Sequence, residues 1–368
     1  MAQILKGAPV VAAMNEANAA RCAALKEKGI VPTLAVVRVG AREDDISYEK
    51  GIVTRCGKVG VEVRQFHLAE DVTQEELLDV IRQINEDASV HGCLIFRPLP
   101  KRFDDRRVQE ALAPEKDVDG ITDGSMAGVF TNMPIGYPPC TAQACLEILK
   151  HYNVPLSGKR AVVVGRSLVV GKPAAMMLDR ENATVTLCNS RTRDLSALCR
   201  EADVLVVAMG RRGAIGADCL REGQVVVDVG IHVNEEGKLC GDVRFDEAEP
   251  LVEAVTPVPG GVGTVGQSGV CSDEHHRRGE GIREAEQGAI HTIPGKPGRQ
   301  LTAKGVGSQL GQQSRLPAQC GVLAAEVCAP AAGLRPEYLR QLRSRGGAQL
   351  QPDFAQTQNG HVHPSLRK

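Results

Sequence analysis

Four short apolar runs between residues 160 and 230 constrain the fold of this chain more than any other feature. They read "RAVVVG" (160–165), "ATVTLCN" (183–189), "DVLVVAMG" (203–210) and "QVVVDVG" (224–230). Runs of this length, rich in β-branched residues, are typical of strands buried on both faces of a sheet. Helix-length segments separate them, which predicts parallel strands joined by helical crossovers. We therefore expect a doubly wound, Rossmann-type sheet here.

The first hundred residues have a similar rhythm and predict a second α/β unit. Strands are expected at 33–40, 61–68 and 92–96, and helices over 10–29, within 42–60 and over 73–87. A further helix is expected over 141–152, at the start of the next domain. Thr73 and Glu76 form a capping-box pattern, and Thr141 is a candidate N-cap. Residues 101–135 are polar and turn-rich. The predicted fold class is α/β, with an N-terminal α/β domain (1–140), a Rossmann-type NAD(P)-binding domain (141–265) and an irregular or disordered tail (266–368).

A candidate dinucleotide-binding turn follows the strand at 160–165. In "GRSLVVGKP" (165–173), Gly165 permits a tight turn, and Gly171 lets the backbone approach a ligand. The helix that starts there can offer unpaired N–H groups to a phosphate. The spacing departs from GxGxxG, so the motif alone fits either a cofactor site or a purely structural turn. Its place at a strand end favours the cofactor.

The end of the next strand bears on the identity of that cofactor. Enzymes that use NAD tend to place an acid there, which binds the ribose 2′-OH. Here the chain reads "CNSRTR", with no acid before Asp194. Ser190 and Arg191, together with Arg166, can hold a 2′-phosphate, so we expect NADP rather than NAD. The alternative is that both arginines are solvated surface charges.

Composition excludes several classes of function. The formal net charge is −1, so no global field favours nucleic acid or an anionic membrane surface. No apolar run is long enough to span a bilayer. The N-terminus lacks the pattern of a signal peptide, which favours the cytoplasm. The 12 cysteines are scattered without metal-like or CxxC spacing, so we expect reduced thiols and no metal site.

Several phrases, in order, give the chain a family resemblance. They are "VVRVG" (36–40) with Tyr48, "PLP" (98–100), "KDVDG" (116–120), "PPCT" (138–141), "VVVGRSLVVGKP" (162–173), "ATVTLCNSRT" (183–192), "DVGI" (228–231), "GDV" (241–243) and "TPVPGGVG" (256–263). Over roughly residues 1–265 the sequence resembles the methylenetetrahydrofolate dehydrogenase/cyclohydrolase family. "DVDG", "GRSLVVGKP" and "TPVPGGVG" together are far more specific than a lone glycine motif.

The resemblance implies a folate enzyme with two activities. Members oxidise 5,10-methylenetetrahydrofolate by hydride transfer to a nicotinamide and then hydrolyse the methenyl product to 10-formyltetrahydrofolate. Asp119 matches the acid that binds the pterin, and Tyr48 matches the catalytic tyrosine. The implied folate contacts are Tyr48, Pro98, Leu99, Asp119, Pro259, Gly260 and Gly261. The implied cofactor contacts are Gly165, Arg166, Ser167, Gly171, Lys172, Pro173, Ser190, Arg191 and Ile231. A homodimer is implied as well.

The chain departs from the family pattern at the hydrolytic step. That step usually uses a Lys four residues after the Tyr, on the same helix face. Position 52 is Ile, and Lys50 points about 200° around the helix from Tyr48. Arg55 is nearer the right face but cannot shuttle protons. Position 96 is Phe where the family usually has Gln. We therefore hypothesise that the dehydrogenase is favoured and the cyclohydrolase is impaired or differently built; a fully bifunctional enzyme is the alternative.

Two readings from other classes remain open. The altered helix and tail are compatible with a catalytically silent folate- or nucleotide-binding protein. A different two-domain dehydrogenase, such as one acting on shikimate-like acids, is a further alternative, but "DVDG" with "TPVPGGVG" argues against it.

The character of the chain changes after Val265. The family usually continues with a stretch like "TSVLM" and a helix, whereas this chain reads "GQSGVCSDEHH". Shifted by one base, codons for residues 270–276 can encode Ser-Val-Leu-Met-Asn-Thr. We hypothesise that a base was gained or lost near residue 266; a genuine extension is the alternative. The His pairs at 275–276 and at 361 and 363 have no predicted fold around them, so we do not assign them a metal.

Overall fold

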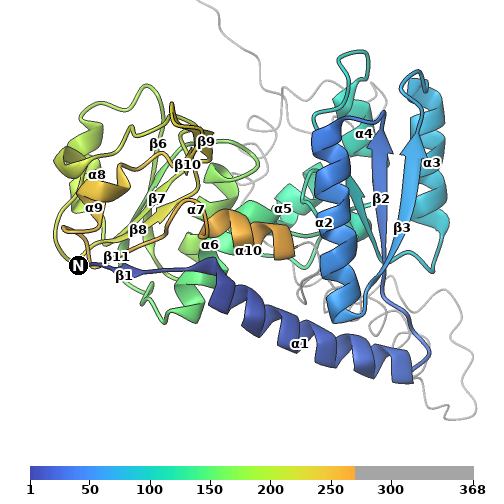
Figure 1. The fold of residues 1–368 in the computed structure, drawn as a ribbon, viewed down its shortest axis with the longest axis horizontal. Helices are drawn as coiled ribbons and strands as arrows, with labels where there is room; N and C mark the ends of the chain where they lie inside the picture. Colours follow the sequence, from blue (N-terminus) through green and yellow to red (C-terminus); the bar gives the residue numbers. More distant parts are fainter. Residues whose placement is uncertain (270–368) are drawn as a thin grey trace, which may run out of the picture. The chain divides into compact units, whose positions relative to one another are not determined.

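The computed structural model of the chain describes residues 1–269, which contain two sheets of parallel strands and one antiparallel pair (Figure 1). The smaller sheet has the order β3-β2-β4, and the larger has the order β1-β11-β8-β7-β5-β6. The smaller sheet contains β2 (Thr33–Val39), β3 (Glu62–Leu68) and β4 (Gly92–Ile95). The larger contains β1 (Gln3–Ile4), β5 (Arg160–Val164), β6 (Thr184–Cys188), β7 (Val204–Val207), β8 (Val225–Asp228) and β11 (Ala254–Val255). The antiparallel pair is β9 (His232–Val233) and β10 (Leu239–Cys240).

Helices connect most of these strands. They are α1 (Gly7–Glu27), α2 (Glu43–Val59), α3 (Gln74–Glu86), α4 (Asp105–Ala111), α5 (Asp123–Thr131), α6 (Cys140–His151), α7 (Gly171–Arg180), α8 (Leu195–Glu201), α9 (Phe245–Ala248) and α10 (Val262–Gly269), with 3-10 turns η1 (Pro114–Lys116) and η2 (Ala217–Cys219). The capping box before α3 is confirmed, because Thr73 Oγ1 accepts the Glu76 amide and the Glu76 carboxylate accepts the Thr73 amide. Each cap satisfies one of the otherwise unpaired donors at the helix start.

The smaller sheet is covered by helices on both faces, which explains why β2 is buried along its whole length. One face packs against α2 through Ile52, Cys56 and Val59. The other face packs against α3 and α4 through Leu77, Ile81, Ile84 and Val108. Alternate residues of a strand point to opposite faces, so a strand between two helical layers is apolar at most positions. The buried Arg38 is the charged exception in β2, and it is paired with Glu49.

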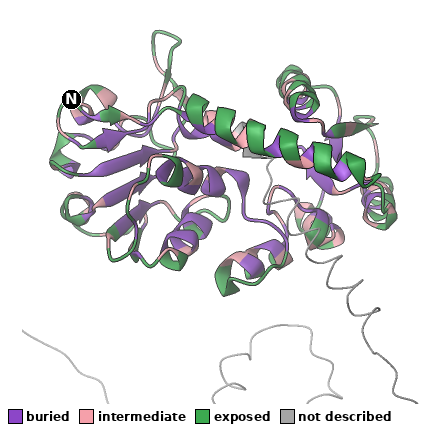
Figure 2. Cartoon of the chain, turned by 90° about the horizontal axis from the view of Figure 1, so that it is seen from below, coloured by how far each residue is buried: buried purple, intermediate pink, exposed green. Residues whose placement is uncertain are grey.

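The larger sheet is built in the same way and confirms the doubly wound prediction. One face packs against α6, α7, α10 and the start of α1, and the other face packs against α8, α9 and η2. In Figure 2 the strands are largely buried while the outer faces of the helices are exposed. Both layers are needed, because the central strands β5, β7 and β8 consist mainly of buried Val.

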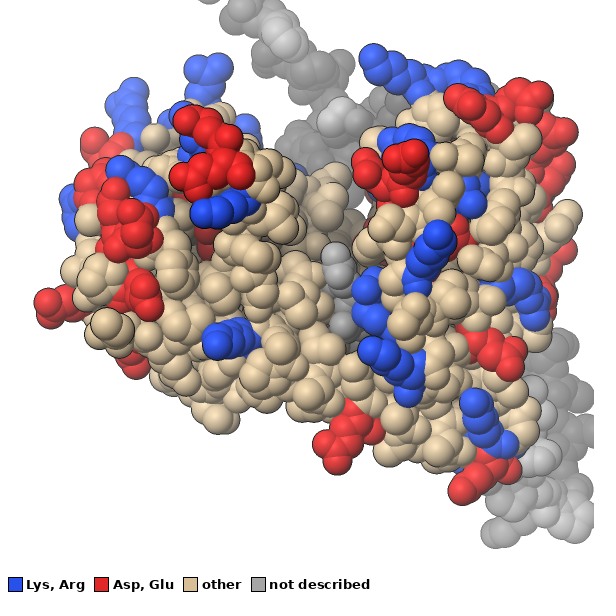
Figure 3. Space-filling view, viewed as in Figure 1, with Lys and Arg blue, Asp and Glu red and all other residues tan. Residues whose placement is uncertain are grey.

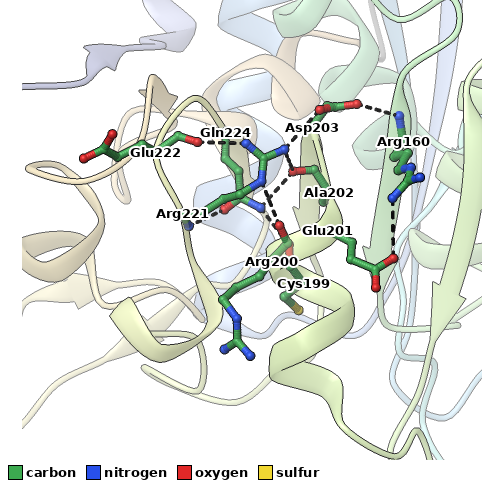
Figure 4. A network of polar contacts seen from close by, with 9 residues as sticks. All are labelled: Arg160, Cys199, Arg200, Glu201, Ala202, Asp203, Arg221, Glu222 and Gln224. Carbon is green, nitrogen blue, oxygen red and sulfur yellow. Dashed lines mark hydrogen bonds and ion pairs between the residues drawn. The ribbon is translucent and has the colours of Figure 1, made fainter.

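A polar network closes the amino ends of β5, β7 and β8 (Figure 4). The fully buried Gln224 donates to the carbonyls of residues 199 and 202, at 2.7 and 2.9 Å. Arg221 donates to Asp203 Oδ1 at 3.1 Å and to two carbonyls of the α8 segment. The other oxygen of Asp203 accepts the Arg160 amide at 2.9 Å. This network lies at the strand ends opposite to the expected cofactor turn, so we assign it to stability.

The structure corrects several expectations about elements. Residues 101–135 contain the helices α4 and α5 rather than only turns. Asp104 caps the start of α4 with its side chain, and Thr122 caps the start of α5. Thr141 is not the N-cap of α6; the N-cap is Pro139, and the helix begins at Cys140. Strands β1 and β11 were missed, because two residues are too few to show a period.

Helix α10 begins at Val262 and ends at Gly269, so it spans the residue at which the tail is expected to begin. The remainder of the expected tail, including the His pairs, lies outside the described residues.

Candidate functional site

The turn between β5 and α7 has room only for backbone at its two glycines. Gly165 has a φ of +125°, and a Cβ there would lie 2.1 Å from the Ala208 carbonyl oxygen. A Cβ on Gly171 would lie 2.0 Å from the Gly165 carbonyl oxygen. No other residue type fits either position without a backbone shift. This cradle is therefore compatible with the close approach of a dinucleotide pyrophosphate.

The donors of this turn differ in detail from the expectation. The amides at the start of α7 are engaged by Ser167. Its hydroxyl accepts from the N-cap residue Val170 at 3.1 Å and from Gly171 at 3.5 Å, and its carbonyl accepts from Lys172 at 3.0 Å. Within residues 1–269, the backbone amides of residues 166–169 have no hydrogen-bond acceptor. The loop amides, rather than the first amides of the helix, are thus the available phosphate donors. Pro173 is buried in the helix.

Parallel pairing brings the two candidate phosphate-binding loops to adjacent strand ends. Val164 of β5 is the partner of Cys188 of β6, and the Gly165 amide donates to the Cys188 carbonyl at 3.0 Å. Arg166 and Arg191 therefore follow neighbouring strands, and both are exposed. The second loop is held by Asn189, whose side chain accepts the Arg191 amide at 3.0 Å. Asp194, the first acid after β6, has a left-handed backbone (φ 49°).

Two buried carboxylates that the sequence interpretation did not single out organise the ends of β7 and β8. Asp242 accepts hydrogen bonds at 2.7–3.0 Å from the amides of residues 209–211 and at 2.7 Å from His232 Nε2. Asp228 accepts the amides of residues 230, 242 and 243 at 2.9–3.0 Å. Burial raises the pKa of Asp228 to about 6, partly offset by these hydrogen bonds. Most of the donors to these two carboxylates come from segments more than ten residues away, which no local pattern records.

The glycine loop at 259–261 lies against the first turn of α1. The Gly7 amide donates to the Gly260 carbonyl at 2.7 Å, and a Cβ on Gly7 would lie 2.5 Å from the Gly261 carbonyl oxygen. Ile231 is also close, since a Cβ on Gly263 would lie 3.2 Å from its Cδ1. The structure thus brings together the candidate folate loop and the candidate cofactor contact Ile231.

The two acids of "DVDG" have different surroundings. Asp117 is fully buried and accepts the amides of Ile121 and Thr122 and the hydroxyl of Ser125, at 2.7–3.0 Å. It is the turn former of this motif. Asp119, in contrast, accepts no hydrogen bond from any residue between 1 and 269. Burial first, and then the charge of Asp117, raise the pKa of Asp119 to about 6, while Arg97 opposes the shift.

Tyr48 lies close to Asp119 and to the two positions that depart from the family pattern. Its ring centroid is 5.5 Å from that of Phe96. Ile52 is completely buried in the core beneath, together with Phe96. Burial and the neighbouring Asp119 and Cys140 raise the pKa of Tyr48 to about 12, although 38% of the residue's surface is exposed. At neutral pH the hydroxyl is therefore protonated and can donate a hydrogen bond.

The remaining candidate contacts follow β4. Pro98 is exposed, and Leu99 packs against the core between the smaller sheet and α3. Arg97 just before them pairs with Asp105, with Nε donating to Oδ1 at 3.0 Å. Asp105 thereby holds Arg97, which opposes the rise in the Asp119 pKa.

The surface and the cysteines add two facts. Acidic and basic side chains are interspersed on the face drawn in Figure 3. No helix within the described part of the chain has the length and hydropathy to cross a bilayer. Eight cysteines between residues 1 and 269 are free thiols, as expected for them from the sequence.

The fold and these strand-end loops place the chain among α/β proteins with a Rossmann-type nucleotide-binding sheet. The model of the tetrahydrofolate dehydrogenase/cyclohydrolase catalytic domain matches residues 5–119, and the model of the NAD(P)-binding domain of the same family matches residues 139–273. The chain belongs to the tetrahydrofolate dehydrogenase/cyclohydrolase family.

Individual relatives agree with this assignment. The bifunctional protein FolD of Carboxydothermus hydrogenoformans is 51% identical over 273 residues, which are 74% of this chain and 95% of the relative. Among solved structures, the bifunctional FolD of Campylobacter jejuni is 36% identical with a TM-score of 0.73, over 77% of this chain and all of that one. A Trypanosoma brucei FolD, solved with NADP and an inhibitor, is 30% identical with a TM-score of 0.70, over 77% of this chain and 98% of that one.

Proposed function

We propose that the chain oxidises 5,10-methylenetetrahydrofolate to 5,10-methenyltetrahydrofolate with NADP⁺ as the acceptor. The hydride leaves the methylene carbon with its electron pair, so the folate is oxidised and NADP⁺ is reduced to NADPH. The nicotinamide supplies this hydride chemistry when it is bound. The protein contributes position, electrostatics and exclusion of water.

The observation that carries the proposal is the unsatisfied carboxylate of Asp119. It is partly buried next to Tyr48 and accepts no hydrogen bond from residues 1–269. A partly buried carboxylate with no donor from the protein is free to accept hydrogen bonds from a ligand. The N–H groups of a pterin ring provide such donors. We propose that Asp119 binds and orients the pterin while Tyr48, Pro98, Leu99 and the loop from Pro259 to Gly261 line the remainder of the folate site.

The cofactor assignment depends on the turn after β5 and the loop after β6. We propose that Gly165, Ser167, Gly171, Lys172 and Pro173 form the turn that receives the pyrophosphate, and that Ile231 lies against the nicotinamide half. Arg166, Ser190 and Arg191 hold the 2′-phosphate. The exposed guanidinium groups on two adjacent strand ends favour NADP, because a phosphate dianion gains most from paired Arg contacts. NAD is the alternative.

A second activity, hydrolysis of the methenyl product to 10-formyltetrahydrofolate, is favoured by the relatives that are described as bifunctional. Two local features argue against hydrolysis by the family's usual route, which uses a lysine at position 52. Ile52 is buried in the core, and the hydroxyl of Tyr48 holds its proton to about pH 12. We propose that any hydrolysis here proceeds without a lysine at position 52 and is slower than the oxidation.

One assay separates these possibilities. Purified chain is mixed with methylenetetrahydrofolate and NADP⁺ or NAD⁺, and NADPH formation and methenyl absorbance are followed together. We expect NADP⁺ reduction with accumulation of the methenyl product. Hydrolysis that keeps pace with oxidation supports the fully bifunctional alternative. No reduction of either cofactor, with folate still binding, supports a catalytically silent folate-binding protein.

We further propose a cytoplasmic homodimer. Within the described residues, β3 is an edge strand of the smaller sheet with one side unpaired, and such an edge can pair with a second copy. Light scattering on the eluted protein tests this, and a monomer mass at micromolar concentration would contradict it.

A further inference from the structure

Arg55 presents two hydrogen-bond donors that no described residue satisfies. Its Nε and Nη2 atoms are buried and have no partner within residues 1–269. A guanidinium has only donors and stays charged. Leaving such donors buried and unpaired costs free energy, so each case in a native structure calls for an explanation. An oxygen atom of a ligand is an acceptor of the right kind.

Helix geometry places this guanidinium near Tyr48. The two residues are seven apart, which is about two turns of α2, so they share one face of the helix. A Cβ on Gly51 would lie 3.0 Å from Nη1 and 3.3 Å from Nη2 of Arg55. The guanidinium of Arg55 therefore extends toward the N-terminus of α2 and lies beside Gly51. A side chain at position 51 would crowd it. The charge of Arg55 lowers the pKa of Tyr48, although less than burial raises it.

Ile52, Arg38 and Arg97 provide no acceptor for the donors of Arg55. Ile52, one residue beyond Gly51, is completely buried in the core and offers no polar atom. Arg97 is paired with Asp105, and Arg38 with Glu49. Of Arg38, Arg55 and Arg97, only Arg55 has buried donor atoms without a partner among residues 1–269.

We propose that Arg55 is a substrate-positioning residue, whose Nε–H and Nη2–H groups bind a carbonyl or carboxylate oxygen of the folate beside Tyr48. The inference deepens the proposed function and rests on it. Arg55 supplies a fixed positive charge to the part of the site where the family pattern has a lysine at position 52. It binds and orients, and it moves no proton.

The test compares Arg55→Met with Lys58→Met. Both variants remove one positive charge from α2, but Lys58 is exposed in the last turn. Titration calorimetry with tetrahydrofolate should show Kd raised about 10-fold or more in Arg55→Met, as expected for lost hydrogen bonds to a charged donor. The KM for NADP⁺ should be unchanged, and Lys58→Met should match the wild type in both.

Thermal unfolding distinguishes a binding role from a structural one. Removing unpaired buried donors should leave the midpoint of Arg55→Met unchanged or raise it. A lower midpoint with unchanged tetrahydrofolate affinity would mean that Arg55 is structural, and it would overturn the inference. If Arg55→Met does not fold, Arg55→Lys keeps the charge but loses the planar fork and should still weaken tetrahydrofolate binding; wild-type affinity in Arg55→Lys would overturn the inference.

Failure of the proposed function has a different signature. If the wild-type chain neither binds tetrahydrofolate nor reduces NADP⁺, the proposed function itself is wrong. If the wild-type chain does both and Arg55→Met binds tetrahydrofolate equally well, only the role of Arg55 is wrong.

Discussion

Replacing Asp119 by Asn should stabilise the folded chain while abolishing tight folate binding. The pKa of Asp119 is about 6 in the folded protein, against an ordinary value of 3.8. This difference corresponds to about 3 kcal/mol. The folded state binds the proton more tightly than the unfolded chain, so the stability contribution is fully present below about pH 4. It is lost as the pH rises through about 6.

Asp119→Asn removes this cost because the amide has no charge to desolvate. In urea unfolding at pH 7.5, we expect the variant to be more stable than the wild type by up to about 3 kcal/mol. The difference should vanish toward pH 4. Calorimetry should show that the Kd for tetrahydrofolate rises by a factor of about 100 or more. This is the loss expected when two hydrogen bonds to a charged carboxylate are removed.

Asp228→Asn is the matched control, since the pKa of Asp228 is also about 6. Its carboxylate accepts three backbone amides, so an Asn NH₂ group would face donors. We expect a loss of about 1–3 kcal/mol for the unsatisfied groups. The two variants should therefore change stability in opposite directions. If Asp119→Asn is less stable than the wild type at pH 7.5, Asp119 has a structural partner and the argument for a ligand-binding acid fails.

Four other outcomes are expected. Gly165→Ala should cost at least about 1–3 kcal/mol of stability and eliminate NADP binding, because its Cβ would lie 2.1 Å from the Ala208 carbonyl oxygen; wild-type cofactor affinity would contradict the tight-turn argument. Arg221→Ala should lower stability by about 1–3 kcal/mol and leave the KM values unchanged, since its network lies at the opposite strand ends. Arg191→Ala should raise the KM for NADP⁺ about 10- to 100-fold but not that for NAD⁺, and equal effects would argue against a 2′-phosphate contact. Resequencing the DNA around codon 266 should reveal a gained or lost base, whereas an immediate stop codon in the shifted frame would refute the frameshift.

Much of the architecture was predictable because it rests on local patterns. The valine-rich runs at 160–164 and 204–207 have to be covered on both faces, which already implies a parallel sheet between helices. The capping box at Thr73 and Glu76 is complete within four residues. The elements that escaped, such as β1 and β11, are stabilised by pairing between residues about 250 positions apart, which no local pattern records.

In the candidate site, too, some features follow from the sequence and others only from the folded structure. The residue types at positions 48, 119, 165 and 171 were sufficient to suggest a folate and dinucleotide enzyme from the sequence. Tertiary structure alone decided which acid of "DVDG" is free: both are short carboxylates in a turn, and only the folded chain directs amides 121 and 122 to Asp117 and none to Asp119. It also decided that Ile52 faces the core while the donors of Arg55 are buried without a partner. The donors to Asp117 lie only four to eight residues further along the chain, so the path of the backbone through this turn decides which acid is satisfied. The residue types alone do not specify that path.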